Sequence, residues 1–164
     1  MEKEKKLGLG VMAIILFLMI SSLALAEDLM ILVTSQDDLK KVQPWVDFLT
    51  KNEITVKSFS PGDFESVKKS FYYVTIMGGM DQNGIKKLIG EVVGPAEAAT
   101  LSTPGTKKMI VKENVWQPGQ KVLIFTGDNS QAAIQARTEN RETWMKYLKE
   151  WFNLGEGPSG LKSY

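Results

Sequence analysis

The sequence predicts an α/β fold: a three-layer arrangement in which a mostly parallel sheet has helices on both faces. Short apolar runs recur along the chain and are rich in β-branched and aromatic residues, as in strands buried on both faces. A polar turn follows each of the main runs, and segments with helical periodicity follow these turns. This alternation favours about four parallel strands, with one further strand placed antiparallel.

The expected strands are the apolar or alternating stretches of the chain. They are residues 28–34, 54–59, 71–77, 108–116 and 121–125. We take strand 121–125 as central because Val122, Leu123, Ile124 and Phe125 form an unbroken apolar run. The turn at residues 117–120 predicts that strand 108–116 is its antiparallel neighbour.

The expected helices have apolar residues three and four positions apart. They are residues 39–49, 64–70, 85–93 and 132–152. Pro44 predicts that the first of them is kinked or broken into two, since proline removes a backbone donor. We expect residues 60–63 to form a turn and residues 96–106, which are small and polar, to form a loop.

The first 26 residues are typical of a secretory signal peptide. Lys3, Lys5 and Lys6 precede an apolar stretch, and Ala24-Leu25-Ala26 fits a small-x-small cleavage site. The alternative is an uncleaved membrane anchor, because residues 7–26 match the roughly 20 residues that span a bilayer. We expect residues 27–154 to form a single domain and residues 155–164 a flexible tail.

The composition limits the possible partners and chemistry. The chain has 20 basic and 19 acidic residues; without the three lysines and two glutamates of residues 1–26, 17 of each remain. A neutral domain gives no electrostatic reason to expect nucleic-acid binding. Histidine and cysteine are both absent, which excludes the common Ser-His and Cys-His nucleophile systems and any disulfide.

Three turns are candidates for a ligand crevice, because such crevices lie at the carboxyl ends of parallel strands. The turns are residues 34–38, 78–84 and 126–130. The candidate binding residues in the last two are Gly78, Gly79, Asp81, Asn83, Gly127, Asp128, Asn129 and Ser130. The alternative is that Asp37, Asp81, Asn129 and Ser130 only cap their own helices.

Known nucleotide motifs do not fit these turns. The glycines at 79 and 84 resemble a phosphate loop, but Ile85 stands where the lysine is required. We therefore predict no cofactor, and we expect the glycines at 78 and 79 to allow a sharp turn or a close backbone approach. A cation held by Asp37, Asp81 and Asp128 is the remaining ligand hypothesis, since hard cations prefer carboxylate oxygens.

A longer pattern resembles the α/β domain of archaeal S-layer and related cell-surface proteins. It comprises Gly78-Gly79 after an apolar strand, a turn with Asn114, Trp116, Pro118 and Gly119, then Gly127-Asp128 before an alanine-rich helix at Ala132, Ala133 and Ala136. The resemblance implies an exported, non-catalytic surface module.

Two functions from different classes follow. The first is an exported, non-catalytic binding or structural module of the cell envelope, with other envelope components or surface proteins as partners. The second is an extracytoplasmic hydrolase or transferase that uses aspartates at the strand ends. Both place the protein outside the cytoplasm, secreted or at the cell surface, and membrane contact is expected only through residues 1–26 if these are retained.

Overall fold

The computed structural model describes residues 28–154, and these form one α/β unit. The expected signal segment at 1–26 and the expected tail at 155–164 lie outside the described residues. Within residues 28–154, no helix is both long enough and apolar enough to cross a membrane.

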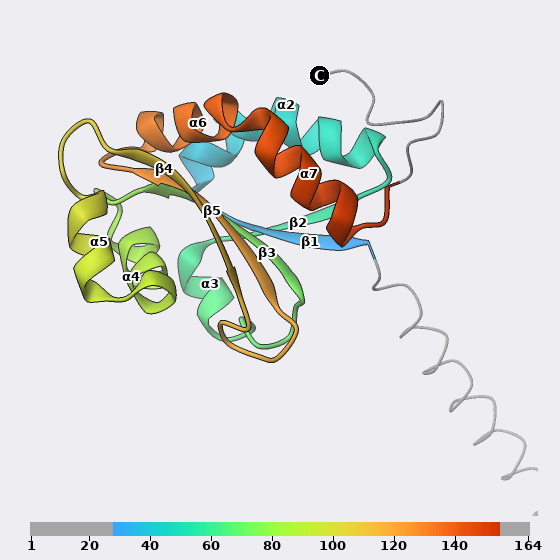
Figure 1. The fold of residues 1–164 in the computed structure, drawn as a ribbon, viewed down its shortest axis with the longest axis horizontal. Helices are drawn as coiled ribbons and strands as arrows, with labels where there is room; N and C mark the ends of the chain where they lie inside the picture. The colour runs from blue at the N-terminus through green and yellow to red at the C-terminus, as the bar shows by residue number, and fades with distance from the viewer. Residues whose placement is uncertain (1–27, 155–164) are drawn as a thin grey trace, which may run out of the picture.

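A single five-stranded mixed sheet forms the centre of the fold, in the order β2-β1-β3-β5-β4 (Figure 1). The strands are β1 (Leu29–Val33), β2 (Thr55–Phe59), β3 (Tyr73–Gly79), β4 (Lys107–Glu113) and β5 (Lys121–Gly127). Four strands are parallel, and β4 pairs antiparallel with β5. The predicted fold class is confirmed, but the central strand is β3 rather than β5, which is the inner strand beside it.

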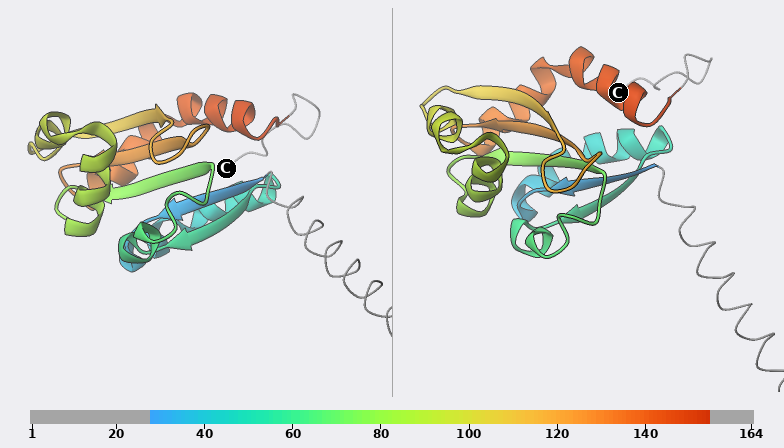
Figure 2. Two further views of the ribbon diagram at one scale, coloured as in Figure 1. Left: turned by 90° about the horizontal axis from the view of Figure 1, so that it is seen from below. Right: turned by 60° about the horizontal axis from the view of Figure 1, so that its bottom comes forward.

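Helices cover both faces of the sheet (Figure 2). They are α2 (Gln36–Lys51), α3 (Pro61–Glu65), α4 (Asn83–Val93), α5 (Pro95–Leu101), α6 (Ser130–Glu139) and α7 (Arg141–Trp151). Helices α2, α6 and α7 pack on one face, and α3, α4 and α5 pack on the other. Alternate residues of the inner strands point to the two faces, which is why these strands are apolar without interruption.

An aromatic group fills the core beneath α2, α6 and α7. The ring of Trp45 packs edge-on against both Phe125 and Trp144, with 5.9 Å between ring centroids in each pair. All three side chains are at least 98% buried. Edge-to-face aromatic pairs add stability beyond the area that they bury. This packing joins α2 and α7 to strand β5.

Two helical expectations are wrong. The predicted loop at 96–106 contains helix α5, which Pro95 begins and in which Ala98 and Leu101 are buried. The predicted single helix at 132–152 is two helices, because Asn140 has non-helical backbone angles and its side-chain amide donates to the carbonyl of Ala136. This local competition with the helical hydrogen bonds ends α6, and α7 then turns across the sheet (Figure 1).

Two other boundaries differ from the sequence prediction. Residues 60–63, for which we predicted a turn, form the cap and first turn of α3, with Ser60 as N-cap and Pro61 at the first helical position. This helix ends at Glu65 rather than at Ser70. Helix α2 continues through Pro44 without dividing into two helices. Pro44 lies on its exposed side, where water can bond the backbone carbonyl that proline leaves free.

The residues of the Asn-x-Trp-x-Pro-Gly pattern build the connection between β4 and β5. Asn114 adopts a left-handed backbone conformation (φ 56°), and its side chain accepts a hydrogen bond from the backbone of Gly119 at 2.7 Å. Trp116 packs against Phe64 with ring centroids 5.5 Å apart. Gln120 is fully buried, and its amide donates to the carbonyls of Lys68 and Phe71. The pattern therefore fixes a hairpin against the rest of the fold.

Candidate functional site

The candidate site lies at the carboxyl edge of the sheet, where three strand-to-helix turns meet. These turns follow β1, β3 and β5, which are consecutive neighbours in the strand order. Gly79 at the end of β3 is in register with Gly127 at the end of β5. The topological switch point of the sheet lies between β1 and β3. The chain passes from β1 to β2 on one side of this point, and from β3 to β5 and β4 on the other side. In open α/β sheets such a point is the usual place for a ligand.

Gly78 and Gly79 allow backbone and side chains to approach the end of β3 closely. A Cβ atom on Gly79 would lie well inside 3.0 Å of the backbone of both Asn129 and Ser130. A Cβ on Gly78 would lie 2.5 Å from Oε1 of Gln82. The absence of a side chain at Gly79 therefore lets the third turn approach the end of β3, and the absence of one at Gly78 leaves room for Gln82 of the second turn.

Four polar side chains from all three turns form what we call the strand-end cluster: Ser35, Asp38, Gln82 and Ser130. The Gln82 amide donates to Oδ2 of Asp38 at 2.7 Å and to Oγ of Ser130 at 2.9 Å. It also approaches Oγ of Ser35 at 3.3 Å, the weakest of the three contacts because an amide nitrogen carries only two hydrogens. Ser130 in turn donates to Oδ2 of Asp38 at 2.8 Å.

Asp38 is the charged centre of the strand-end cluster. It is 98% buried, and Nζ of Lys41 donates to its Oδ1 at 2.9 Å. Burial acts to raise the pKa of Asp38, but hydrogen bonds from Lys41, Gln82, Ser130 and Ser35 oppose burial, and the net effect is a pKa below the ordinary aspartate value. Asp38 is therefore an ionised acceptor whose oxygens are bonded to side chains of this chain.

The helix caps differ in part from the sequence prediction. Asn129 caps α6 as expected, because its side chain accepts from the backbone of Ala132 at 3.0 Å, whereas Ser130 is the first helical residue and its hydroxyl donates to Asp38. The cap of α2 is Ser35 rather than Asp37, and the cap position of α4 is Gln82 rather than Asp81. Gln82 makes no capping bond with its side chain, since that side chain is directed to the strand-end cluster instead.

The remaining predicted binding residues occupy different surroundings. Asp81 and Asn83 are exposed at the start of α4. The carboxylate of Asp128 accepts from the backbone of Gly105 at 3.0 Å and from the side chain of Asn129 at 3.1 Å. Asp128 thus ties the loop before β4 to the end of β5, and its role is distinct from that of Ser130.

A cavity of about 300 Å³ lies beside Asp128, at the start of α6. It is lined by Gly105, Lys107, Asp128, Asn129, Gln131, Ala132 and Gln135. Of the predicted binding residues, Asp128 and Asn129 line this cavity, whereas Gly78, Gly79, Asp81, Asn83, Gly127 and Ser130 do not. The structure therefore divides the predicted set between a shallow cavity and the turns around the strand-end cluster.

Carboxylates do not gather into a metal centre in the part of the chain that the structure describes. Within residues 28–154, no group of three or more acidic side chains has the arrangement needed to hold an ion. The structure consequently does not bring Asp37, Asp81 and Asp128 together as the cation hypothesis requires.

Of the four residues of the strand-end cluster, sequence reasoning named Ser130 and missed Ser35, Asp38 and Gln82 as site residues. Asp38 carries a detectable signal, because Ser35 and an acidic residue three positions later resemble a capping box. The Asp38 backbone does donate to Oγ of Ser35 at 3.1 Å. Gln82 carries no comparable signal, since its partners lie 44 to 48 positions away in the sequence.

The fold and the strand-end cluster define the class of this protein: an α/β protein with a mixed five-stranded sheet whose strand-end turns are hydrogen-bonded to one another. No protein-family model, curated protein or solved structure matches the chain.

Proposed function

We propose that this protein is an exported, non-catalytic binding or structural module of the cell envelope, of the kind found in archaeal S-layer and related surface proteins. The observation that carries the non-catalytic part is the strand-end cluster. Its central carboxylate, at the place where α/β proteins usually bind a ligand, accepts its hydrogen bonds from Lys41, Gln82 and Ser130 of the same chain.

The electrostatics of Asp38 support a structural role. A general base works best when its pKa lies near the operating pH, and burial of a carboxyl group raises its pKa toward that range. In Asp38 the hydrogen bonds from neighbouring side chains outweigh burial and lower the pKa instead. The resulting carboxylate is a weak base, and its main effect is to join three turns.

Export is supported by the order of basic, apolar and small residues in the first 26 positions. Envelope components or other surface proteins are the expected partners, and the resemblance that begins at Gly78-Gly79 and ends at Ala136 favours the same location. The hydrolase or transferase alternative is favoured by one feature, the cavity that Asp128 and Lys107 both line.

Export is tested by expressing the full chain and separating the envelope from the cytoplasm. The N-terminal peptide of the protein is then identified by mass spectrometry. We expect a peptide that begins at Glu27. The matched control is Ala26→Phe, which removes the small residue at the cleavage site and should leave the chain uncut. Recovery of wild type in the cytoplasm with Met1 intact would contradict export.

Catalysis is tested separately on the same purified protein. Chromogenic phosphate, ester and glycoside substrates are compared for wild type, Asp128→Asn and Asp38→Asn. We expect all three to show the same background hydrolysis. Turnover by wild type that Asp128→Asn abolishes without altering the melting temperature would replace the module with the hydrolase alternative.

A further inference from the structure

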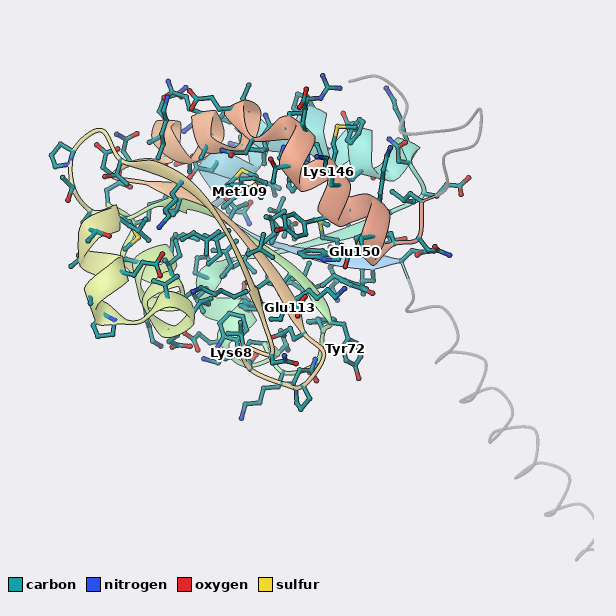
Figure 3. All side chains as sticks on the ribbon, in the orientation of Figure 1. Lys68, Tyr72, Met109, Glu113, Lys146 and Glu150 are labelled. Atoms are coloured by element: carbon teal, nitrogen blue, oxygen red, sulfur yellow. The ribbon has the colours of Figure 1, made fainter. Side chains whose placement is uncertain are left out.

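The cavity beside Asp128 remains open at the carboxyl edge of the sheet, next to the position that the strand-end cluster fills. Its volume is about 300 Å³, and it lies beside the end of β5, the start of β4 and the first turns of α6. In Figure 1, the loop before β4 and the start of α6 lie at the same end of the sheet. Figure 3 shows Met109 on β4 beside α6, and Lys107 of the cavity stands two residues before it. Small-molecule sites begin at about this volume, so the cavity suits one small ligand.

Hydrogen bonds hold the wall of this cavity in place. The backbone of Asp128 donates to the carbonyl of Thr106 at 3.0 Å, and its carboxylate accepts from the backbone of Gly105 at 3.0 Å. A Cβ atom on Gly127 would lie 2.3 Å from the carbonyl oxygen of Thr106, so the loop before β4 packs directly on the end of β5. The cavity wall is therefore formed before any ligand arrives, as is usual in ligand sites.

Two side-chain amides of α6 are free to bind a ligand in the cavity. Gln131 and Gln135 are four positions apart, so they lie on the same face of the helix one turn from each other. Both are exposed, and neither side chain has a hydrogen-bond partner among residues 28–154. Each amide offers two N–H donors and one carbonyl acceptor. A hydroxyl group, which both donates and accepts, matches such amides.

The charges of the lining restrict the class of ligand. Lys107 is paired with Glu139, whereas Asp128 makes no ion pair among residues 28–154 and so repels phosphate and other anions. A hard cation needs several oxygen ligands, and Asp128 is the one carboxylate of the lining. Lys107 opposes an organic ammonium group, and Ala132 is the one aliphatic side chain available to an apolar ligand. A neutral molecule rich in hydroxyl groups meets none of these obstacles.

We propose that this cavity binds one neutral sugar residue, with Gln131 and Gln135 bonding its hydroxyl groups and the carboxylate of Asp128 accepting from a further hydroxyl. This inference rests on the proposed function as a binding module of the envelope, and it names a neutral glycan as the component bound. The site is shallow and supplies few hydrogen bonds, so a single sugar should bind weakly, with a Kd in the millimolar range.

Binding is tested on the purified full chain by NMR titration with glucose, galactose, mannose and N-acetylglucosamine in turn. At least one of them should shift the backbone amide signals of Gly105, Asn129 and Gln131. Gln131→Ala and Gln135→Ala should each weaken binding about tenfold, because each removes the hydrogen bonds of one amide. The matched control is Gln36→Ala, an exposed glutamine in the first turn of α2 and outside the cavity, which should bind as wild type does.

Two charged sugars test the ligand class in the same titration. Glucuronate, which is anionic, and glucosamine, which is cationic, should bind more weakly than N-acetylglucosamine. Tighter binding of either would overturn the neutral assignment, and so would unchanged signals of the cavity residues with every neutral sugar, or equal affinities of wild type and both glutamine variants. Recovery of the protein in the cytoplasm contradicts export but leaves this titration unaltered, so the two failures are distinguishable.

Discussion

Replacement of Asp38 by alanine should destabilise the fold far more than replacement of its neighbour Asp37. Both are acidic residues in the first turn of α2, so both interact with the helix dipole, worth about 0.3–1 kcal/mol. Only Asp38 also accepts hydrogen bonds from Gln82 at 2.7 Å and Ser130 at 2.8 Å. A hydrogen bond to a charged group contributes about 1.5–3 kcal/mol, and two such bonds give about 3 kcal/mol or more.

The contribution of Lys41 to this total is small. Its side chain is 52% exposed, so water replaces the lost carboxylate, and exposed ion pairs contribute about 1 kcal/mol at most. We therefore expect Asp38→Ala to lower the free energy of unfolding by about 3 kcal/mol more than Asp37→Ala does. Urea denaturation followed by tryptophan fluorescence measures this difference, because Trp45 and Trp144 are buried.

The pH dependence gives an independent check with a defined sign. The folded pKa of Asp38 is lowered relative to the unfolded chain. Its stabilisation is therefore present above the unfolded pKa and is lost as the pH falls through the folded pKa. The gap between wild type and Asp38→Ala should be largest near neutral pH and should shrink in strong acid. Equal destabilisation by Asp37→Ala and Asp38→Ala, or a gap that does not change with pH, would refute the role assigned to the strand-end cluster.

Two further substitutions test the packing around this cluster. Gly79→Ala should destabilise the fold by at least about 2 kcal/mol, since the added Cβ collides with backbone atoms of the third turn. The matched control is Gly90→Ala, a helical site where the nearest atom to the added Cβ is 4.0 Å away. This control should be neutral or up to about 1 kcal/mol stabilising, because alanine favours the helix more than glycine does. Thermal unfolding of both variants gives the comparison, and similar melting temperatures would contradict the close approach at β3. Phe125→Ala should lower the unfolding free energy by about 3–5 kcal/mol, because a fully buried ring beside Trp45 leaves a cavity. A denaturation midpoint close to wild type would show that β5 is not an inner strand.

The sequence by itself determined the five strands and the fold class. Val122 to Phe125 form an unbroken apolar run, and a strand with helices on both faces requires that pattern whatever its neighbours are. The antiparallel placement of β4 also followed from the short polar connection to β5. The sequence did not predict α5, because a short alanine-rich segment has the small side chains that loops also use.

Only the tertiary structure decided the strand order and the composition of the strand-end cluster. An apolar strand has the same local pattern at any inner position of a sheet, so periodicity cannot place β1 beside β3. Once β1, β3 and β5 are neighbours, Asp38 meets Gln82 from 44 positions away and Ser130 from 92 positions away. Local patterns report how each segment is buried, whereas contacts between distant polar side chains depend on which strand ends share an edge. For this reason the sequence indicated the edge of the sheet at which the three turns meet but not Asp38, the residue at the centre of the cluster there.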